Sequence, residues 1–314
     1  MKELTVGVDI GGTNTKIGVV DVDAKILAEG KIKTPDYPEV DDYVIALSNA
    51  IKESLDAIKE PFKLRGIGIG APNGNFYKGT IEFAPNLPWK GQIPLVEKMS
   101  KNFDVPIVMT NDANAAAMGE MIYGKAKGLK EFIVITLGTG LGSGIVVDGK
   151  VVYGHDGFAG EMGHTIYDPN GRLCGCGRRG CLETYASAPG IVLTVGELLA
   201  KSTVQSKLRD ISINKMESKD IYEAAVKGDR LALEAFEITA KILGLKLADS
   251  IAHTSPEAIF MFGGLAESGD YILKPTKKYM EQYLLDVYKN KVKLEISGLK
   301  GGDAAVLGAA ALIL

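Results

Sequence analysis

The order of apolar and polar positions divides the chain into two stretches that begin in the same way. Three short apolar segments at the start predict three strands separated by turns, at residues 4–10, 16–21 and 25–33. Three similar segments follow much later, at residues 132–137, 143–148 and 150–153. In each set a Gly/Thr turn leads into a strand that ends in Val-Val-Asp, at Asp21 and at Asp148. Such a repeat predicts a duplicated lobe.

The other segments alternate between helical and strand patterns. Residues 40–58 carry apolar side chains at helical spacing, and 64–70 and 105–110 are typical of buried strands. The Gly/Pro/Asn-rich residues 71–94 predict loops with a hairpin. Further helices are predicted at 189–201, 218–227, 229–252 and 304–314, further strands at 258–262 and 292–296, and an exposed connection at 205–216. Strands that alternate with helices predict an α/β fold.

Composition and charge narrow the function classes. The chain has 314 residues, enough for two lobes with cores of their own. A net charge of −3 argues against a general nucleic-acid or anionic-membrane surface. No signal region precedes the first strand and no apolar run reaches membrane-spanning length, so we expect a cytoplasmic protein. The Ala/Leu-rich helices predict core or a subunit interface, and we expect a homodimer or homotetramer.

All three cysteines fall in one glycine-rich segment, Cys174-Gly-Cys176-Gly-Arg-Arg-Gly-Cys181, and His164 lies just upstream. Three thiolates and an imidazole make a complete tetrahedral zinc shell, and the glycines let the backbone turn tightly. Unrelated buried thiols are the alternative, but random placement would rarely gather every cysteine in one such loop. We therefore expect structural Zn²⁺ on these four side chains, with His155 as a weaker candidate ligand.

Two glycine-rich turns are candidates for phosphate binding. Asp9-Ile-Gly-Gly-Thr-Asn-Thr-Lys16 exposes backbone N–H groups that can hold phosphate oxygens, and Asp9 can hold Mg²⁺ directly or through water. Leu137-Gly-Thr-Gly-Leu-Gly-Ser-Gly144 is similar, and neither turn has Rossmann or P-loop spacing. An ordinary glycine hairpin is the alternative. Two facing turns suggest a nucleotide between the lobes, and the candidate residues are Asp9, Gly11, Gly12, Thr13, Asn14, Lys16, Gly138, Thr139, Gly140, Gly263 and Gly264.

Asn111 and Asp112 lie where a predicted strand ends and a helix begins. Asp or Asn is a preferred N-cap, worth about 1 kcal/mol, so a purely structural role is one interpretation. The carboxyl end of a strand is also where α/β active sites lie, and a base there can take a proton from a substrate hydroxyl. Glu161, His164 and Glu183 flank the cysteine loop and suit a polyhydroxylated ligand.

Taken together, these segments resemble the ROK family of sugar kinases and repressors over nearly the whole chain. The motifs are Asp9-Ile-Gly-Gly-Thr13, Asn111-Asp112-Ala-Asn114, Leu137-Gly-Thr-Gly140, Gly160-Glu-Met-Gly-His164, Cys174-x-Cys176-Gly-x-x-Gly-Cys181-x-Glu183 and Phe262-Gly-Gly264. One departure is Asn73, where family members commonly carry glycine after the proline.

The resemblance implies an α/β, two-lobed actin/hexokinase-like ATPase fold with a duplicated βββαβαβα-type core and an interlobe cleft that holds ATP and Mg²⁺. We expect a small lobe of residues 1–111 plus 301–314 and a large lobe of residues 112–300 with the zinc-bound sugar loop. It implies Asp112 as general base and zinc on the four ligands named above. The implied sugar-binding residues are Asn86, Asn111, Asp112, Glu161, His164 and Glu183.

The resemblance therefore predicts an ATP-dependent hexose kinase. The segment Cys181-Leu-Glu-Thr-Tyr-Ala-Ser-Ala188 is similar to the glucokinase branch of the family, which favours glucose phosphorylated on its 6-hydroxyl. N-acetylmannosamine, N-acetylglucosamine, mannose and fructose are the alternative sugars. A sugar-sensing regulator is a further alternative, but repressors of the family carry an N-terminal helix-turn-helix and this chain begins at the first strand. A chaperone or filament of the same fold would need no zinc-braced loop.

Overall fold

A computed structural model, which describes residues 1–299 and 303–314, contains two five-stranded sheets of the same topology. The first has the order β3-β2-β1-β4-β8 and the second the order β11-β10-β9-β12-β13. Their strands are β1 (Lys2–Ile10), β2 (Thr15–Asp21), β3 (Ile26–Ile32), β4 (Phe62–Gly70), β8 (Ile107–Thr110), β9 (Phe132–Leu137), β10 (Leu141–Val147), β11 (Lys150–Val151), β12 (Ala258–Phe262) and β13 (Lys293–Ile296). In both sheets three antiparallel strands are followed by two parallel ones, so the predicted duplication is confirmed.

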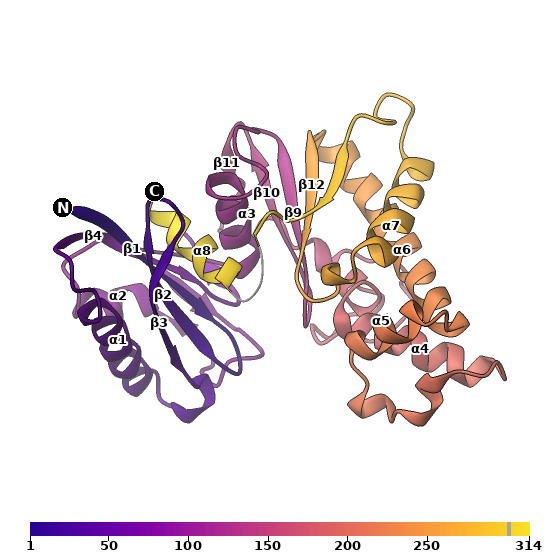
Figure 1. Cartoon of the computed structure of the whole chain (residues 1–314), viewed down its shortest axis with the longest axis horizontal. Coiled ribbons are helices and arrows are strands. Elements are labelled where there is room, and N and C mark those ends of the chain that lie inside the picture. The colour runs from indigo at the N-terminus through magenta and orange to yellow at the C-terminus, as the bar shows by residue number, and fades with distance from the viewer. Residues whose placement is uncertain (300–302) are drawn as a thin grey trace.

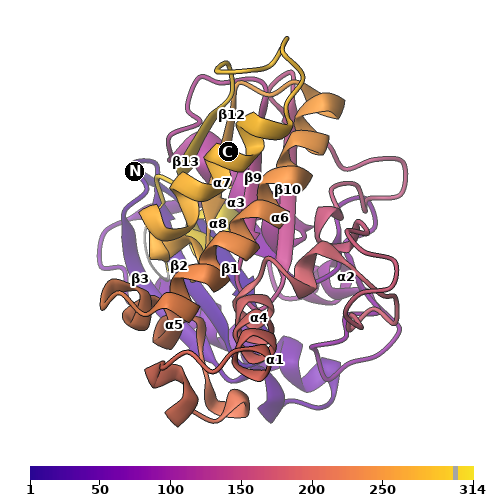
Figure 2. The same ribbon diagram turned by 90° about the vertical axis from the view of Figure 1, so that its right-hand side faces the viewer.

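The helices form layers on the two sheets. They are α1 (Val40–Asp56), α2 (Leu95–Ser100), α3 (Asp112–Ile122), α4 (Ala188–Lys201), α5 (Ser218–Val226), α6 (Arg230–Thr254), α7 (Asp270–Tyr283) and α8 (Ala304–Ala310). Figure 1 shows two lobes, one built on each sheet, with α3 and α8 between them. Figure 2 shows α6 and α7 in front of the second sheet. Among the described residues, no helix is long and apolar enough to cross a membrane.

Glycines allow α8 and α3 to approach their neighbours closely. A Cβ on Gly7 of β1 would lie 2.0 Å from the carbonyl oxygen of Val306, so α8 rests directly on the first sheet. A Cβ on Gly119 of α3 would lie 2.8 Å from the Cα of Gly308, where the two helices cross. Helix α3 also packs on β10, because a Cβ on Gly144 would lie 2.6 Å from the carbonyl oxygen of Ala113. These two helices therefore link the lobes.

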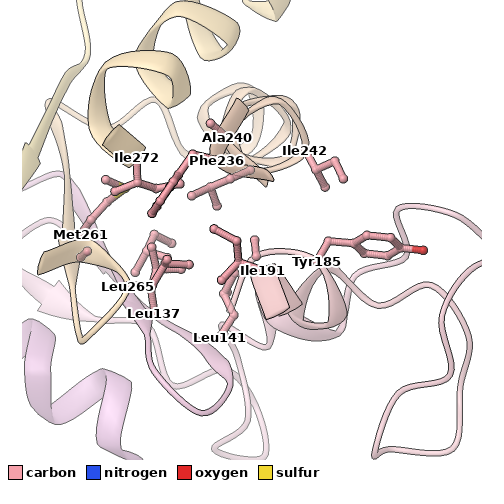
Figure 3. Packing of buried hydrophobic residues seen from close by; sticks show 14 of the residues in the cluster. Leu137, Leu141, Tyr185, Ile191, Phe236, Ala240, Ile242, Met261, Leu265 and Ile272 are labelled. Atoms are coloured by element: carbon pink, nitrogen blue, oxygen red, sulfur yellow. The ribbon is translucent and has the colours of Figure 1, made fainter. Parts of the chain in front are cut away.

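Each lobe has its own hydrophobic core. One cluster lies between the first sheet and α1 and includes Tyr43 and Trp89, whose ring centroids are 4.3 Å apart. The larger cluster lies between the second sheet and α4, α6 and α7 (Figure 3). In Figure 3, Leu137 and Leu141 of the second sheet point toward Phe236 of α6. This core therefore holds both ends of the β9–β10 turn.

Several elements differ from the predictions. Helix α7 was not predicted: Ile272, Thr276 and Met280 have helical spacing and are buried, but Pro275 and exposed charged positions hide the pattern. Residues 71–94 form a three-stranded sheet of β5 (Gly74–Asn75), β6 (Thr80–Glu82) and β7 (Gln92–Ile93). The predicted final helix ends at Ala310 and continues as a 3-10 turn, Ala311–Ile313.

The predicted division at residues 300 and 301 falls on 300–302, which lie outside the described residues. The division into 1–111 plus 301–314 and 112–300 therefore stays a prediction.

Candidate active site

The first glycine turn, between β1 and β2, is held by polar contacts. The Gly11 N–H donates to the Asn14 carbonyl oxygen at 3.0 Å, and the Thr34 hydroxyl donates to the Gly11 carbonyl oxygen at 2.7 Å. A Cβ on Gly12 would lie 2.5 Å from the carbonyl oxygen of Asn86. The backbone of Asn86, a predicted sugar ligand, therefore packs on the predicted phosphate turn.

The second glycine turn, between β9 and β10, lies beside Gly263, which with Gly264 follows β12. The Gly138 N–H donates to the Gly140 carbonyl oxygen, and the Leu265 N–H donates to the Leu137 carbonyl oxygen, each at 3.0 Å. Gly263 has φ of +102°, and a Cβ there would lie 2.7 Å from the Leu137 carbonyl oxygen. The predicted nucleotide-binding residues are all exposed or half-buried. The exposed ones are Thr13, Lys16, Thr139 and Gly264, and the half-buried ones are Asp9, Gly11, Gly12, Asn14, Gly138, Gly140 and Gly263.

Asn111, not Asp112, is the N-cap of α3. The Asn111 side chain accepts a hydrogen bond from the Asn114 N–H at 2.7 Å, whereas Asp112 is the first helical residue and its carboxylate accepts from the Ala113 N–H at 2.9 Å. The predicted capping role is therefore confirmed for Asn111 and does not apply to Asp112. Asp112 is exposed, yet it lies among enough protein that burial raises the pKa of its carboxyl.

The Asp9 carboxyl has a raised pKa. Burial is the main cause, the negative charge of Asp112 adds to it, and the positive charge of Lys16 opposes it; together they raise the pKa of Asp9 to about 6. Two carboxylates, at the end of β1 and at the start of α3, thus lie within electrostatic reach of each other. Such a pair favours a bound cation.

Glu161 extends this acidic centre toward the cysteine loop. Burial raises the pKa of Glu161, the His164 charge lowers it, and the charges of Asp112 and Glu183 raise it further. The tertiary structure therefore brings together side chains from three separate segments, as the sugar-site prediction requires. Carboxylates gathered in this way can accept hydrogen bonds from several hydroxyls of one ligand.

The four predicted zinc ligands converge. The ligand atoms of His164, Cys174, Cys176 and Cys181 all lie within 4.8 Å of one another. Cys174 Sγ is 3.8 Å from His164 Nδ1, and Cys176 Sγ is 3.6 Å from Cys181 Sγ. A tetrahedron with metal–sulfur distances of about 2.3 Å has edges of about 3.8 Å, so these side chains fit a structural zinc ion. His155, the weaker candidate, lies outside this cluster.

Arg172, which the sequence analysis missed, fastens the cysteine loop to α4. Its guanidinium donates to the carbonyl oxygens of Thr184 at 2.6 Å and Gly190 at 3.0 Å, and pairs with Glu197 at 2.8 Å. It also lies 4.5 Å from the ring centroid of Tyr185. The sequence gives no signal that separates this arginine from the other two in the loop.

A second missed contact joins the small sheet to the segment after β11. The Asn75 side chain is fully buried and donates to the Asp156 carbonyl oxygen at 2.7 Å. The rings of Phe76 and Tyr153 stack with centroids 3.9 Å apart. Nearby, Asn73 has φ of +50°, a conformation that asparagine tolerates better than most residues, so it can replace a glycine here.

Two surface grooves lie apart from most of these residues. One of about 560 Å³ runs between β3 and α1 and contains none of the predicted site residues. Another, of about 360 Å³, is lined by Lys16 and by Asp303 and Val306 near α8. The candidate site is thus defined by the two turns and the acidic centre, not by these grooves.

Known proteins resemble the chain over its whole length. The sequence profile of the ROK family matches residues 5–314. The chain is 38% identical over 314 residues to the glucokinase of Streptomyces coelicolor, with 98% of this chain and 97% of that enzyme covered. A solved ROK family glucokinase from Streptomyces griseus, in complex with glucose and AMPPNP, matches with a TM-score of 0.83 and 37% identity and covers 98% of both chains. A putative xylose repressor from Caldicellulosiruptor sp. is 29% identical over 317 residues, with 99% of this chain and 78% of the repressor covered.

Proposed function

Because this chain belongs to the ROK family, we propose that it is an ATP-dependent hexose kinase that phosphorylates glucose on the 6-hydroxyl, with Asp112 as general base. One observation carries the proposal: Asp112 lies in an acidic centre with Asp9 and Glu161, and Asn111 has taken over the capping role. The full-length similarity to glucokinases supports the reaction class, and the AMPPNP-bound relative supports ATP as phosphoryl donor.

The two glycine turns are suited to hold the phosphates. Their backbone N–H groups and the Lys16 side chain provide donors for phosphate oxygens, and Asp9 can hold Mg²⁺ directly or through water. When bound, Mg²⁺–ATP supplies the phosphoryl group and the positive charge that offsets the phosphates. The residues of this chain mainly position the reactants.

Asp112 is suited to take the proton of the sugar hydroxyl. Burial raises the pKa of its carboxyl, which increases its basicity, and the side chain keeps an exposed face to meet a substrate. The other hydroxyls of the sugar would be bound by Asn86, Asn111, Glu161, His164 and Glu183. His164, Cys174, Cys176 and Cys181 would hold a zinc ion, which would order the loop that leads to Glu183.

Sugar specificity is the part of the proposal that needs the widest assay. A coupled ADP assay should compare kcat/KM for glucose, mannose, fructose, N-acetylmannosamine and N-acetylglucosamine at fixed Mg²⁺ and ATP. We expect glucose to lead, because carboxylates that a bound sugar covers are left unpaired when an expected hydroxyl is missing. A tenfold lead for an N-acetylated sugar or fructose would overturn the glucose assignment but keep the hexose kinase.

A sugar-sensing regulator is the second candidate function, because the xylose repressor covers this chain almost entirely. A regulator of this kind would bind a sugar but would form no ADP with any sugar in the panel. We also infer a homodimer or homotetramer, which light scattering after size-exclusion chromatography would test.

A further inference from the structure

Glu183 contacts both the cysteine cluster and the second glycine turn. Its Oε2 atom accepts a hydrogen bond from the Leu141 N–H at 3.1 Å, at the end of that turn. Its Oε1 atom lies 3.7 Å from Cys174 Sγ. A Cβ on Gly140 would lie 2.3 Å from Oε2, so the carboxylate rests against the turn itself. One side chain therefore spans from the metal ligands to the proposed phosphate site.

The backbone on either side of the cluster makes further contacts with the same turn. The Ala188 N–H, at the start of α4, donates to the Gly138 carbonyl oxygen at 2.9 Å. On the opposite side, a Cβ on Gly163, next to His164, would lie 2.0 Å from the Leu141 carbonyl oxygen. The residue beside His164 and the segment that follows Cys181 thus contact the turn at its two ends.

The same segments share one core. Leu137 and Leu141, which flank the turn, belong to the same hydrophobic cluster as Tyr185, from the segment after Cys181 (Figure 3). Leu182 of that segment belongs to the cluster as well. A displacement of the cysteine loop would therefore move side chains that pack against the base of the turn.

We propose that Glu183 is a positioning residue for the nucleotide, so that the zinc cluster orders the Gly138–Gly140 turn as well as the sugar loop. The inference rests on the proposed function, because it takes this turn as the phosphate site. Oε2 accepts from the Leu141 N–H, so the second carboxylate oxygen, Oε1, can accept from a sugar hydroxyl.

The test separates the two roles by measuring nucleotide affinity with no sugar present. Glu183→Ala removes the bond to Leu141 and should weaken binding of Mg²⁺–AMPPNP in calorimetry by about tenfold, the effect of losing one charged hydrogen bond. Glu183→Gln keeps a carbonyl oxygen that can accept from the Leu141 N–H and should stay within about twofold of the wild type. Both variants should bind glucose more weakly.

A double-mutant cycle with Gly140 checks the contact directly. Gly140→Ala should weaken nucleotide binding in the wild-type background because its Cβ meets the Glu183 carboxylate. In the Glu183→Ala background the same change should cost much less, so the two effects should not add. Additive effects would contradict the contact.

Metal content and hydrogen exchange complete the experiment. Both Glu183 variants should retain about one zinc per chain, since Glu183 is not among the four clustered ligands. Chelation of zinc should speed exchange of the Leu141 amide. Wild-type nucleotide affinity in Glu183→Ala, or an unchanged Leu141 amide after chelation, would overturn the inference. If the wild type itself bound no nucleotide, the proposed function would fail instead.

Discussion

Replacement of Asp9 by asparagine should stabilise the lobe built on the first sheet while it weakens nucleotide binding. Burial and the neighbouring charge of Asp112 raise the pKa of Asp9 from 3.8 to about 6, which means that the fold disfavours its ionised form. Asparagine has nearly the same shape and no charge. The cost that the wild type bears for a charged Asp9 should therefore disappear in Asp9→Asn.

The magnitude and its pH dependence follow from the pKa shift. A rise of about two units corresponds to about 3 kcal/mol, and solvent screening at this half-buried site lowers that to on the order of 2 kcal/mol. Because the folded-state pKa is the higher one, wild-type stability is undiminished below pH 3.8 and is lost as pH rises toward about 6. The stability gap between Asp9→Asn and wild type should open across that interval and stay constant above it.

Trp89 gives a direct readout for this lobe. It is the single tryptophan of the chain, is 5% exposed, and packs against Tyr43 in the core of the lobe built on the first sheet. Urea unfolding followed by its fluorescence, from about pH 4 to pH 8, should give a higher midpoint for Asp9→Asn at neutral pH. A gap of zero at pH 7.5, or one that does not change with pH, would refute the reasoning.

Asp21→Asn is a matched control with the opposite expected sign. The Asp21 carboxylate accepts from the backbone N–H groups of Asp23 at 3.1 Å and Lys25 at 2.9 Å, and lies 3.5 Å from Lys2 Nζ. Loss of its charge removes favourable contacts, so this variant should unfold at lower urea. For Asp9→Asn itself, calorimetry should show weaker binding of Mg²⁺–AMPPNP than the wild type. The charged Asp9 would then lower stability but be needed for nucleotide binding.

The remaining predictions concern catalysis, zinc and lobe closure. Asp112→Asn should lower turnover with glucose by roughly 10²-fold or more without lowering the urea midpoint, because burial disfavours the charged form of Asp112. Asn111→Ala should instead cost about 1 kcal/mol of stability through the lost cap. Wild-type turnover in Asp112→Asn would contradict a role as base. Cys176→Ser should lose the zinc, as elemental analysis would show, and bind glucose more weakly; active wild-type protein without zinc would contradict the metal assignment. Small-angle scattering should show a smaller radius of gyration with saturating glucose and AMPPNP, because closure of the lobes completes the site; identical profiles would count against closure.

Local patterns allowed much of the fold to be predicted, and their failures have local causes. The six strands of the two meanders were found because short apolar runs between glycine turns are strong signals. Helix α7 was missed because it buries only three residues, Ile272, Thr276 and Met280, and because a proline, Pro275, lies inside it. The small sheet β5–β7 was predicted as loops with one hairpin because its strands have two or three residues each.

The sequence by itself determined the duplicated topology, the two glycine turns and the cysteine cluster. Each of these is encoded within a short stretch, since three cysteines within one tight loop need little help from the rest of the chain to converge. Only the tertiary structure decided that Asn111 is the cap and Asp112 is not, because both residue types suit that position equally well. It alone brought Asp9, Asp112 and Glu161 together and laid Glu183 on the second turn. Those contacts join residues far apart in the chain. They depend on how closely the helices and sheets pack, and a local sequence pattern carries no information about that packing.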